Sequence, residues 1–98
     1  MFNLVVLTGR LTADPELKTT ANGIPVTTFS IAVDRDYAPK GEDRQTDFIN
    51  LVAWRQTAEF ISRYFHKGSS LCVTGSIQTR TWTDNTGAKR YATDVVVD

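Results

Sequence analysis

The stretch TDFINLVAWR, residues 46–55, decides the fold, because a strand pattern there is followed almost at once by the only convincing helix pattern. Side chains of a strand alternate between its two faces. One face here carries Phe48, Asn50, Val52 and Trp54, and the other carries Ile49, Leu51 and Ala53. Residues 57–67 predict a helix, with Gly68 where a left-handed C-cap is favoured.

Four more extended segments flank this strand and helix. Residues 26–33 alternate apolar and polar side chains, as a half-buried strand does. Residues 4–11 are rich in leucine and valine and contain Gly9, which predicts a bulge or a sharp bend. Residues 71–82 and 90–97 are expected to form a hairpin.

The order of these segments predicts the fold class. Three strands, one helix and two strands fit into 98 residues, which is enough for one domain covering residues 1–98. Strands near ten residues long, with a glycine in the first, coil strongly and close into a barrel. We therefore predict an all-β protein with one short helix, a five-stranded Greek-key OB-fold barrel with the helix between strands 3 and 4. The second and third strands of such a barrel are its usual ligand face.

The charge is uneven along the chain although it sums to zero. Between residues 49 and 93 there are six cations and two anions, and most acidic residues lie in the first half. This distribution favours a nucleic-acid partner only slightly. Cys72 is the only cysteine, which excludes an internal disulfide. The first residues resemble neither an export signal nor a membrane span, so a cytoplasmic location is expected.

Four aromatic residues are predicted to stack on nucleobases. Trp82 lies with Arg80 on the polar face of residues 72–82, whereas Leu71, Val73 and Ile77 are expected on the core face. A tryptophan in water beside cations favours a flat partner such as a base. Phe48 and Trp54 share a strand face about 20 Å apart, and Tyr37 begins the polar loop that follows residue 33. Each base stacked on such a ring is worth about 1–3 kcal/mol.

Each of these rings also has a structural interpretation. Trp82 could pack under its own hairpin, Trp54 could cap the barrel against the helix, Phe48 could be half buried at a rim and Tyr37 could pin its loop. The other aromatics of the strands and the helix are interpreted as structural: Phe29, Phe60, Tyr64 and Phe65.

Seven cations are candidate phosphate contacts: Lys18, Arg35, Arg55, Lys67, Arg80, Lys89 and Arg90. Arg80 is the strongest candidate because it shares a strand face with Trp82, two residues away. Arg55 adjoins Trp54 but points to the opposite face if its strand stays regular. The remaining cations could each neutralise a phosphate or simply be solvated.

The sequence contains no recognisable catalytic constellation. His66 is expected in the last turn of the helix, where it suits the helix C-terminus better than a role as general base. Cys72 has no histidine nearby in sequence, and the acidic residues form no metal-ligand pattern. No glycine-rich phosphate loop occurs. We therefore predict a binding module that is not an enzyme and uses no cofactor and no metal.

Several blocks of the sequence resemble the bacterial single-stranded DNA-binding protein family. They are residues 4–11 (LVVLTGRL), 14–17 (DPEL), 22–23 (NG) with 26–33 (VTTFSIAV), 46–54 (TDFINLVAW), 67–69 (KGS), the closing hairpin over 87–97 and, most specifically, 75–84 (GSIQTRTWTD). The resemblance covers essentially the whole chain. It carries base-stacking roles onto Tyr37, Phe48, Trp54 and Trp82. Some members have tryptophan where this chain has Tyr37 and Phe48, and phenylalanine where it has Trp54, which preserves a flat ring at each position.

The resemblance also implies an assembly and a setting. Members of that family are OB-fold homotetramers, built as a dimer of dimers, that wrap single-stranded DNA without strong sequence preference during replication, recombination and repair. The expected location is the bacterial nucleoid. Members usually continue into a flexible linker with an acidic tip that recruits replication and repair proteins. The sequence here runs to Asp98, so that recruitment is expected only if the natural protein carries such a tail.

Two other functions are the alternatives to DNA binding. An OB module could serve protein assembly, as a dimeric scaffold with weak affinity for DNA. A hydrolase or nuclease would require metal-dependent turnover, for which the sequence offers no site. Binding to single-stranded DNA is the leading hypothesis.

Overall fold

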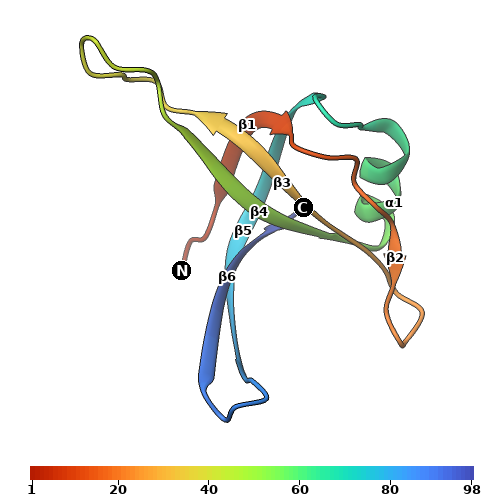
Figure 1. The fold of residues 1–98 in the computed structure, drawn as a ribbon. Coiled ribbons are helices and arrows are strands. Elements are labelled where there is room, and N and C mark those ends of the chain that lie inside the picture. The colour runs from red at the N-terminus through yellow and green to blue at the C-terminus, as the bar shows by residue number, and fades with distance from the viewer.

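The computed structural model describes all of residues 1–98 (Figure 1). It contains six strands and one helix: β1 (Val5–Leu11), β2 (Lys18–Thr19), β3 (Pro25–Asp34), β4 (Thr46–Trp54), α1 (Arg55–Tyr64), β5 (Ser70–Thr83) and β6 (Lys89–Val97). The strands form one sheet in the order β1-β5-β6-β4-β3-β2, and an additional pairing of β1 with β3 closes it. This closed sheet of five long strands with a single helix is an OB fold, which confirms the predicted fold class.

The helix follows the fourth strand rather than the third, because β2 is an extra strand that the sequence analysis missed. In β2, Lys18 pairs with Val26 and Thr19 pairs with Pro25 of β3. Two residues are too few to show a strand period in the sequence. Among the five long strands, the helix still lies between the third and the fourth, which are β4 and β5.

Helix α1 begins and ends earlier than the predicted range 57–67. Its first residue, Arg55, has a φ of 58°, so the chain leaves β4 through a left-handed conformation. The helix ends at Tyr64 because Phe65 is extended. Gly68 has a φ of 86° in the turn that follows, so its predicted role as the C-cap is wrong.

The core lies inside the barrel and under α1. It contains ten buried apolar side chains: Leu11, Phe29, Ile31, Leu51, Ala53, Ala58, Ile61, Leu71, Val73 and Val95. The predicted inward faces of β3 and β4 are therefore confirmed, and α1 covers the barrel with Ala58 and Ile61. Of the three aromatics predicted for the helix, Phe65 lies just beyond its end and packs partly against the core, whereas Phe60 and Tyr64 lie on it and are exposed. The opposite faces of β3 and β4 are left free for a ligand.

Closure of the barrel depends on where β1 changes partner. Strand β1 pairs with β5 from Val5 to Arg10 and with β3 through Arg10–Ala32 and Leu11–Ile31. A Cβ atom on Gly9 would lie 2.6 Å from the carbonyl oxygen of Ala32. The close approach of β1 to β3 therefore requires a glycine at this position.

Two hairpins extend beyond the closed part of the barrel (Figure 1). One is the β5–β6 hairpin. The last pair between β1 and β5 joins Val5 to Gly75, so beyond Gly75 strand β5 pairs only with β6. Ile77, predicted for the core face, is therefore 45% exposed. The other projection is the connection from β3 to β4, residues 35–45, which carries the exposed Tyr37.

Thr27 of β3 is a buried polar residue with an unpaired hydroxyl. It is 1% exposed, and its Oγ1 has no hydrogen-bond partner. A buried unpaired polar group costs about 1–3 kcal/mol. Because valine has nearly the same shape, we expect Thr27→Val to raise the free energy of unfolding by about 1 kcal/mol in urea denaturation. Thr27→Ser keeps the hydroxyl and loses the methyl group, so it should be destabilising. A less stable Thr27→Val protein would contradict this account.

Candidate nucleic-acid interface

The outward face of β3 and β4 carries two of the predicted stacking residues. Four cross-strand pairs line it: Val26–Trp54, Thr28–Val52, Ser30–Asn50 and Ala32–Phe48. Directly opposed residues share one face of a sheet, and Phe48 and Trp54 lie about 20 Å apart along β4. Both rings are exposed. The face, called here the β3–β4 strip, is therefore a polar and small-residue surface with an aromatic ring at each end.

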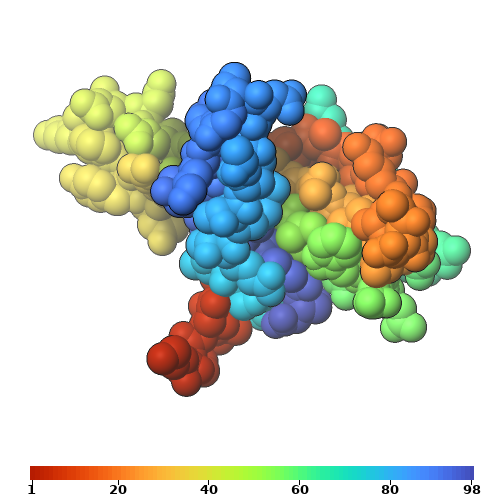
Figure 2. Space-filling model, turned by 90° about the horizontal axis from the view of Figure 1, so that it is seen from below, coloured from red at the N-terminus to blue at the C-terminus, as the bar shows by residue number.

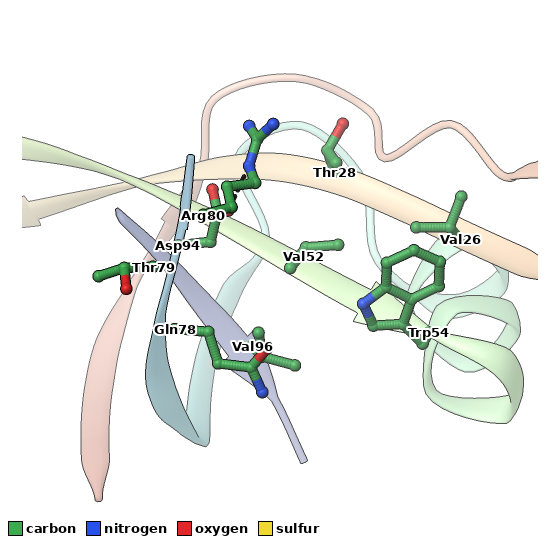
Figure 3. Close-up of a pocket in the computed structure, with 9 residues that line it drawn as sticks. All are labelled: Val26, Thr28, Val52, Trp54, Gln78, Thr79, Arg80, Asp94 and Val96. Carbon is green, nitrogen blue, oxygen red and sulfur yellow. Dashed lines mark hydrogen bonds and ion pairs between the residues drawn. The ribbon is translucent and has the colours of Figure 1, made fainter. Parts of the chain in front are cut away.

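At its Trp54 end, the strip meets the β5–β6 hairpin and forms a groove of about 440 Å³ (Figure 3). This Trp54 groove is lined by Val26, Thr28, Val52, Trp54, Gln78, Thr79, Arg80, Asp94 and Val96. Figure 3 shows Trp54 and Arg80 on opposite sides of the groove, with Val52 between them. The fold thus brings together a ring from β4 and a cation from β5 that the sequence analysis had identified separately.

Arg80 is held by two neighbours. Its Nε donates a hydrogen bond to Oδ2 of Asp94 over 2.8 Å. Its guanidinium carbon lies 4.9 Å from the ring centroid of Trp82, which is within range of a cation–π interaction. Arg80 and Trp82 therefore point to the same side of the hairpin. Trp82 nevertheless remains 43% exposed, so Arg80 does not cover its whole ring.

Two more grooves continue along the strip. A groove of about 490 Å³ shares Thr28, Val52, Arg80 and Asp94 with the Trp54 groove and adds Thr12, Ala13, Phe29, Ser30, Asn50 and Leu51. A groove of about 530 Å³ at the other end is lined by Thr8, Gly9, Arg10, Ala32, Asp34, Thr46, Phe48 and Ser70. The three hollows therefore follow the β3–β4 strip from Trp54 to Phe48.

The sequence analysis missed Arg10 and Asp94. Arg10 lines the groove of Phe48 because it pairs with Ala32, the residue opposite Phe48. Asp94 lines the Trp54 groove from β6. Neither position could be recognised from local sequence, because each depends on a pairing between strands that are far apart in the chain.

Three of the predicted cations lie beside the predicted rings. Arg80 lines the Trp54 groove. Lys18 pairs with Val26, so it shares a face with Val26 and hence with Trp54. Arg90 is directly opposite Trp82, and its Nε donates to Oδ2 of Asp84 over 2.7 Å.

The other four cations and Tyr37 lie away from these grooves. Arg35 donates from Nε (3.0 Å) and Nη2 (3.1 Å) to Asp47, on the face of β4 opposite Phe48. Lys89 pairs with Thr83, on the side of the hairpin away from Trp82. The remaining positions are the start of α1 for Arg55, the turn after α1 for Lys67 and the 35–45 loop for Tyr37.

Asp84 organises the tip of the β5–β6 hairpin. Its Oδ1 accepts hydrogen bonds from the backbone N–H of Thr86 (2.9 Å), the Thr86 hydroxyl (2.6 Å) and the backbone N–H of Ala88 (3.1 Å). The Thr86 hydroxyl, followed by Arg90, lowers the pKa of Asp84 from 3.8 to about 2. Arg35 likewise lowers the pKa of Asp47. Both carboxylates are therefore charged in the folded protein at neutral pH.

The Asp84 carboxylate should titrate at an unusually low pH. Its pKa is lower in the folded than in the unfolded chain, so its stabilising contribution is present at neutral pH and is lost as the pH falls from about 4 towards 2. An NMR titration of the Asp84 carboxyl should give a midpoint of about 2. Thr86→Val removes the hydroxyl donor and should raise that midpoint. Equal midpoints in the two proteins would exclude the hydroxyl as the main cause.

The residues considered for catalysis are dispersed. No group of three or more histidine, cysteine, aspartate or glutamate side chains is placed to hold a metal ion. Cys72 is a free, exposed thiol on β5. His66 lies beyond the end of α1, so its predicted place in the last helical turn is wrong, and its backbone N–H donates to Oγ of Ser69 over 2.9 Å.

The single helix, α1, lacks the length and apolar character needed to cross a membrane.

The barrel and its grooved strip define the molecule as an OB-fold protein with a candidate binding face. A profile described as "Single-strand binding protein family" matches residues 2–98. The chain therefore belongs to the single-strand binding protein family.

Curated relatives align with the whole chain. A protein named single-stranded DNA-binding protein from Caldanaerobacter subterraneus is 49% identical over all 98 residues of this chain and 65% of its own length. Proteins of the same name from Enterococcus faecalis and Halalkalibacterium halodurans are 48% and 46% identical over all 98 residues of this chain, covering 52% and 58% of their own lengths. The chain thus spans between about half and two thirds of the length of these relatives.

Proposed function

We propose that this protein binds single-stranded DNA with little sequence preference and protects it in replication, recombination and repair. The observation that carries the proposal is the β3–β4 strip, with exposed rings at both ends and Arg80 and Trp82 at its side. Every base has a flat face, so a series of rings binds any sequence, while cations contact the phosphates. The names of the relatives, which describe binding to single-stranded DNA, support the same function.

Residues 1–98 would act as one OB-fold binding domain in the bacterial nucleoid. In the proposed interface, Tyr37, Phe48, Trp54 and Trp82 stack on bases. The cations with the most suitable positions for phosphate contacts are Arg10, Lys18, Arg80 and Arg90. Four others would contact only a strand that leaves the strip and wraps around the barrel: Arg35, Arg55, Lys67 and Lys89.

Quenching of tryptophan fluorescence by oligo-dT tests this function directly. Both tryptophans are exposed and belong to the proposed interface, so stacking should quench them. The logarithm of the binding constant should fall linearly with the logarithm of the salt concentration, with a slope of about −0.7 per phosphate contacted. Duplex DNA of the same length should bind far more weakly. Absence of quenching and of any mobility shift at low salt would exclude the proposed function.

We also propose that the chain assembles into a homotetramer, as a dimer of dimers. Beyond its pairs with β5, strand β1 pairs with β3 only through its last two residues, Arg10 and Leu11, so much of its other edge is open. Val6 on β1 and Phe2 and Leu4 just before it are exposed, and Figure 2 shows the N-terminal residues, in red, standing clear of the surface. An open edge with apolar side chains favours the addition of a second copy.

Light scattering, with and without oligo-dT, measures this assembly. The expected mass is four times that of the chain. The same experiment separates the proposal from the scaffold alternative, because a dimeric scaffold would give twice the mass and bind oligo-dT weakly. A monomer at all concentrations would contradict assembly of this chain.

A further inference from the structure

Asp94 places a negative charge in a groove that is proposed to hold a polyanion. It lines both the Trp54 groove and the groove that continues from it. Its side chain is 24% exposed, and its Oδ2 accepts the Nε–H of Arg80 over 2.8 Å. A carboxylate at this position repels an approaching phosphate and also binds the cation that the phosphate would contact.

The pairing changes what Arg80 can offer to DNA. An arginine can bind a phosphate through two parallel N–H donors. In Arg80 the Nε–H is already donated to Asp94, and the guanidinium lies over the Trp82 ring. A phosphate must therefore either bind the remaining Nη groups next to a carboxylate or displace Asp94 from the Nε–H.

The exposure of the two side chains indicates which partner moves. The side chain of Arg80 is 63% exposed, whereas that of Asp94 is only 24% exposed. Asp94 pairs with Gln78 across the β5–β6 ladder, so its backbone is held within the sheet at the groove wall. Exposed ion pairs are weak, so Arg80 can turn towards a phosphate. It then leaves an unpaired carboxylate beside the DNA.

We propose that Asp94 limits the affinity of the interface for single-stranded DNA by competing with the phosphate for Arg80. This inference rests on the proposed function. The charge of Asp94 opposes binding, and it acts by holding Arg80 away from the phosphate. Removal of the charge should strengthen binding, which is the opposite of what loss of a binding residue produces.

The Arg35–Asp47 pair provides a matched control. It is also an exposed arginine–aspartate pair in which Nε donates to Oδ2, over 3.0 Å. Asp47 lies on the face of β4 opposite Phe48 and lines none of the three grooves along the strip. Asp47→Asn therefore removes the same charge from the chain without removing it from the grooves.

The test is a titration of the protein with labelled oligo-dT at a low and at a high salt concentration, read by fluorescence anisotropy. Asp94→Asn should lower the Kd by about three- to tenfold at low salt. The effect should be smaller at high salt, because ions screen the repulsion between the Asp94 carboxylate and the phosphate. Asp47→Asn should change the Kd by less than about twofold for an oligo-dT short enough to occupy the strip alone, because Arg35 would contact only a strand that leaves the strip. Asp94→Ser should also bind more tightly, and it serves as a second variant if Asp94→Asn folds poorly in thermal denaturation.

A double-mutant cycle tests the route through Arg80. In an Arg80→Ala background, Asp94→Asn should lose at least about half of its logarithmic gain in affinity. An equal gain in both backgrounds would overturn the competition for Arg80. If the unsubstituted protein binds oligo-dT while Asp94→Asn and Asp94→Ser bind equally or more weakly, the inference fails and the binding function remains. If the unsubstituted protein does not bind at all, the proposed function itself fails.

Discussion

Trp54→Ala is expected to weaken binding of labelled oligo-dT about thirtyfold. A base stacked on an aromatic ring is worth about 1–3 kcal/mol, and each 1.4 kcal/mol is about tenfold in Kd. Trp54 forms one side of its groove and is 42% exposed, so its ring is available to a base. It is also the N-cap of α1, but its side chain makes no capping hydrogen bond. The fold should therefore survive the change, as thermal denaturation would verify.

Two controls separate stacking from other causes. Trp54→Phe keeps a flat ring and should bind within about threefold of the unsubstituted protein. Tyr91→Ala removes a ring that is 78% exposed on the face of the hairpin opposite Trp82, and its Kd should be nearly unchanged. Unfolding of Trp54→Ala would favour the alternative in which this ring caps the barrel. An equal loss in Tyr91→Ala would show that exposed aromatic area, and not the strip, governs binding.

Gly75→Ala is expected to lower the free energy of unfolding by about 3 kcal/mol, at the upper end of the usual range for overpacking. A Cβ atom on Gly75 would lie 2.1 Å from the carbonyl oxygen of Val96 and 2.9 Å from its carbonyl carbon. Both are backbone atoms, so no side chain can rotate away. Gly75 also pairs with Val5 of β1 and Val97 of β6. To admit a methyl group, β6 must move away from β5 next to the closure of the barrel.

Urea denaturation of Gly75→Ala measures this effect. Thr74→Ala is the matched control, because Thr74 is the exposed neighbour on the same strand, and surface changes of this kind stay within about 0.5 kcal/mol. A loss of 3 kcal/mol would lower the melting temperature by roughly 12–24 °C in a domain of this size. An unchanged transition would mean that the two strands are further apart at Gly75 than the structure has them.

The order of the long strands and the helix could be predicted because it is a property of local sequence. Residues such as Phe29, Ile31, Leu51 and Ala53 recur at every second position, and a half-buried strand requires that period. Helix α1 could be located from Ala58 and Ile61 in the same way, although its ends could not. Those ends depend on the left-handed Arg55 and the extended Phe65, and a helical period does not encode such backbone turns.

The candidate site was only partly predictable. Alternation along one strand placed Phe48 with Trp54, and Arg80 with Trp82, because neighbours on a strand face are set by local geometry. It could not place Trp54 opposite Arg80, Arg10 beside Phe48 or Asp94 beside Arg80. It also assigned Ile77 to the core, because the pattern of β5 continues past the point where β1 ends and the barrel no longer covers it.

The sequence by itself determined the five long strands and the helix, their order and the two sides of each long strand, because these follow from residue spacing along a single segment. The tertiary structure alone decided which sides meet. It paired β4 with β3 and β5 with β6, placed Arg35 and Lys89 away from the grooves and brought Asp94 against Arg80. Pairing and register join residues that are distant in the chain, and a shift of one residue would turn every side chain to the opposite face.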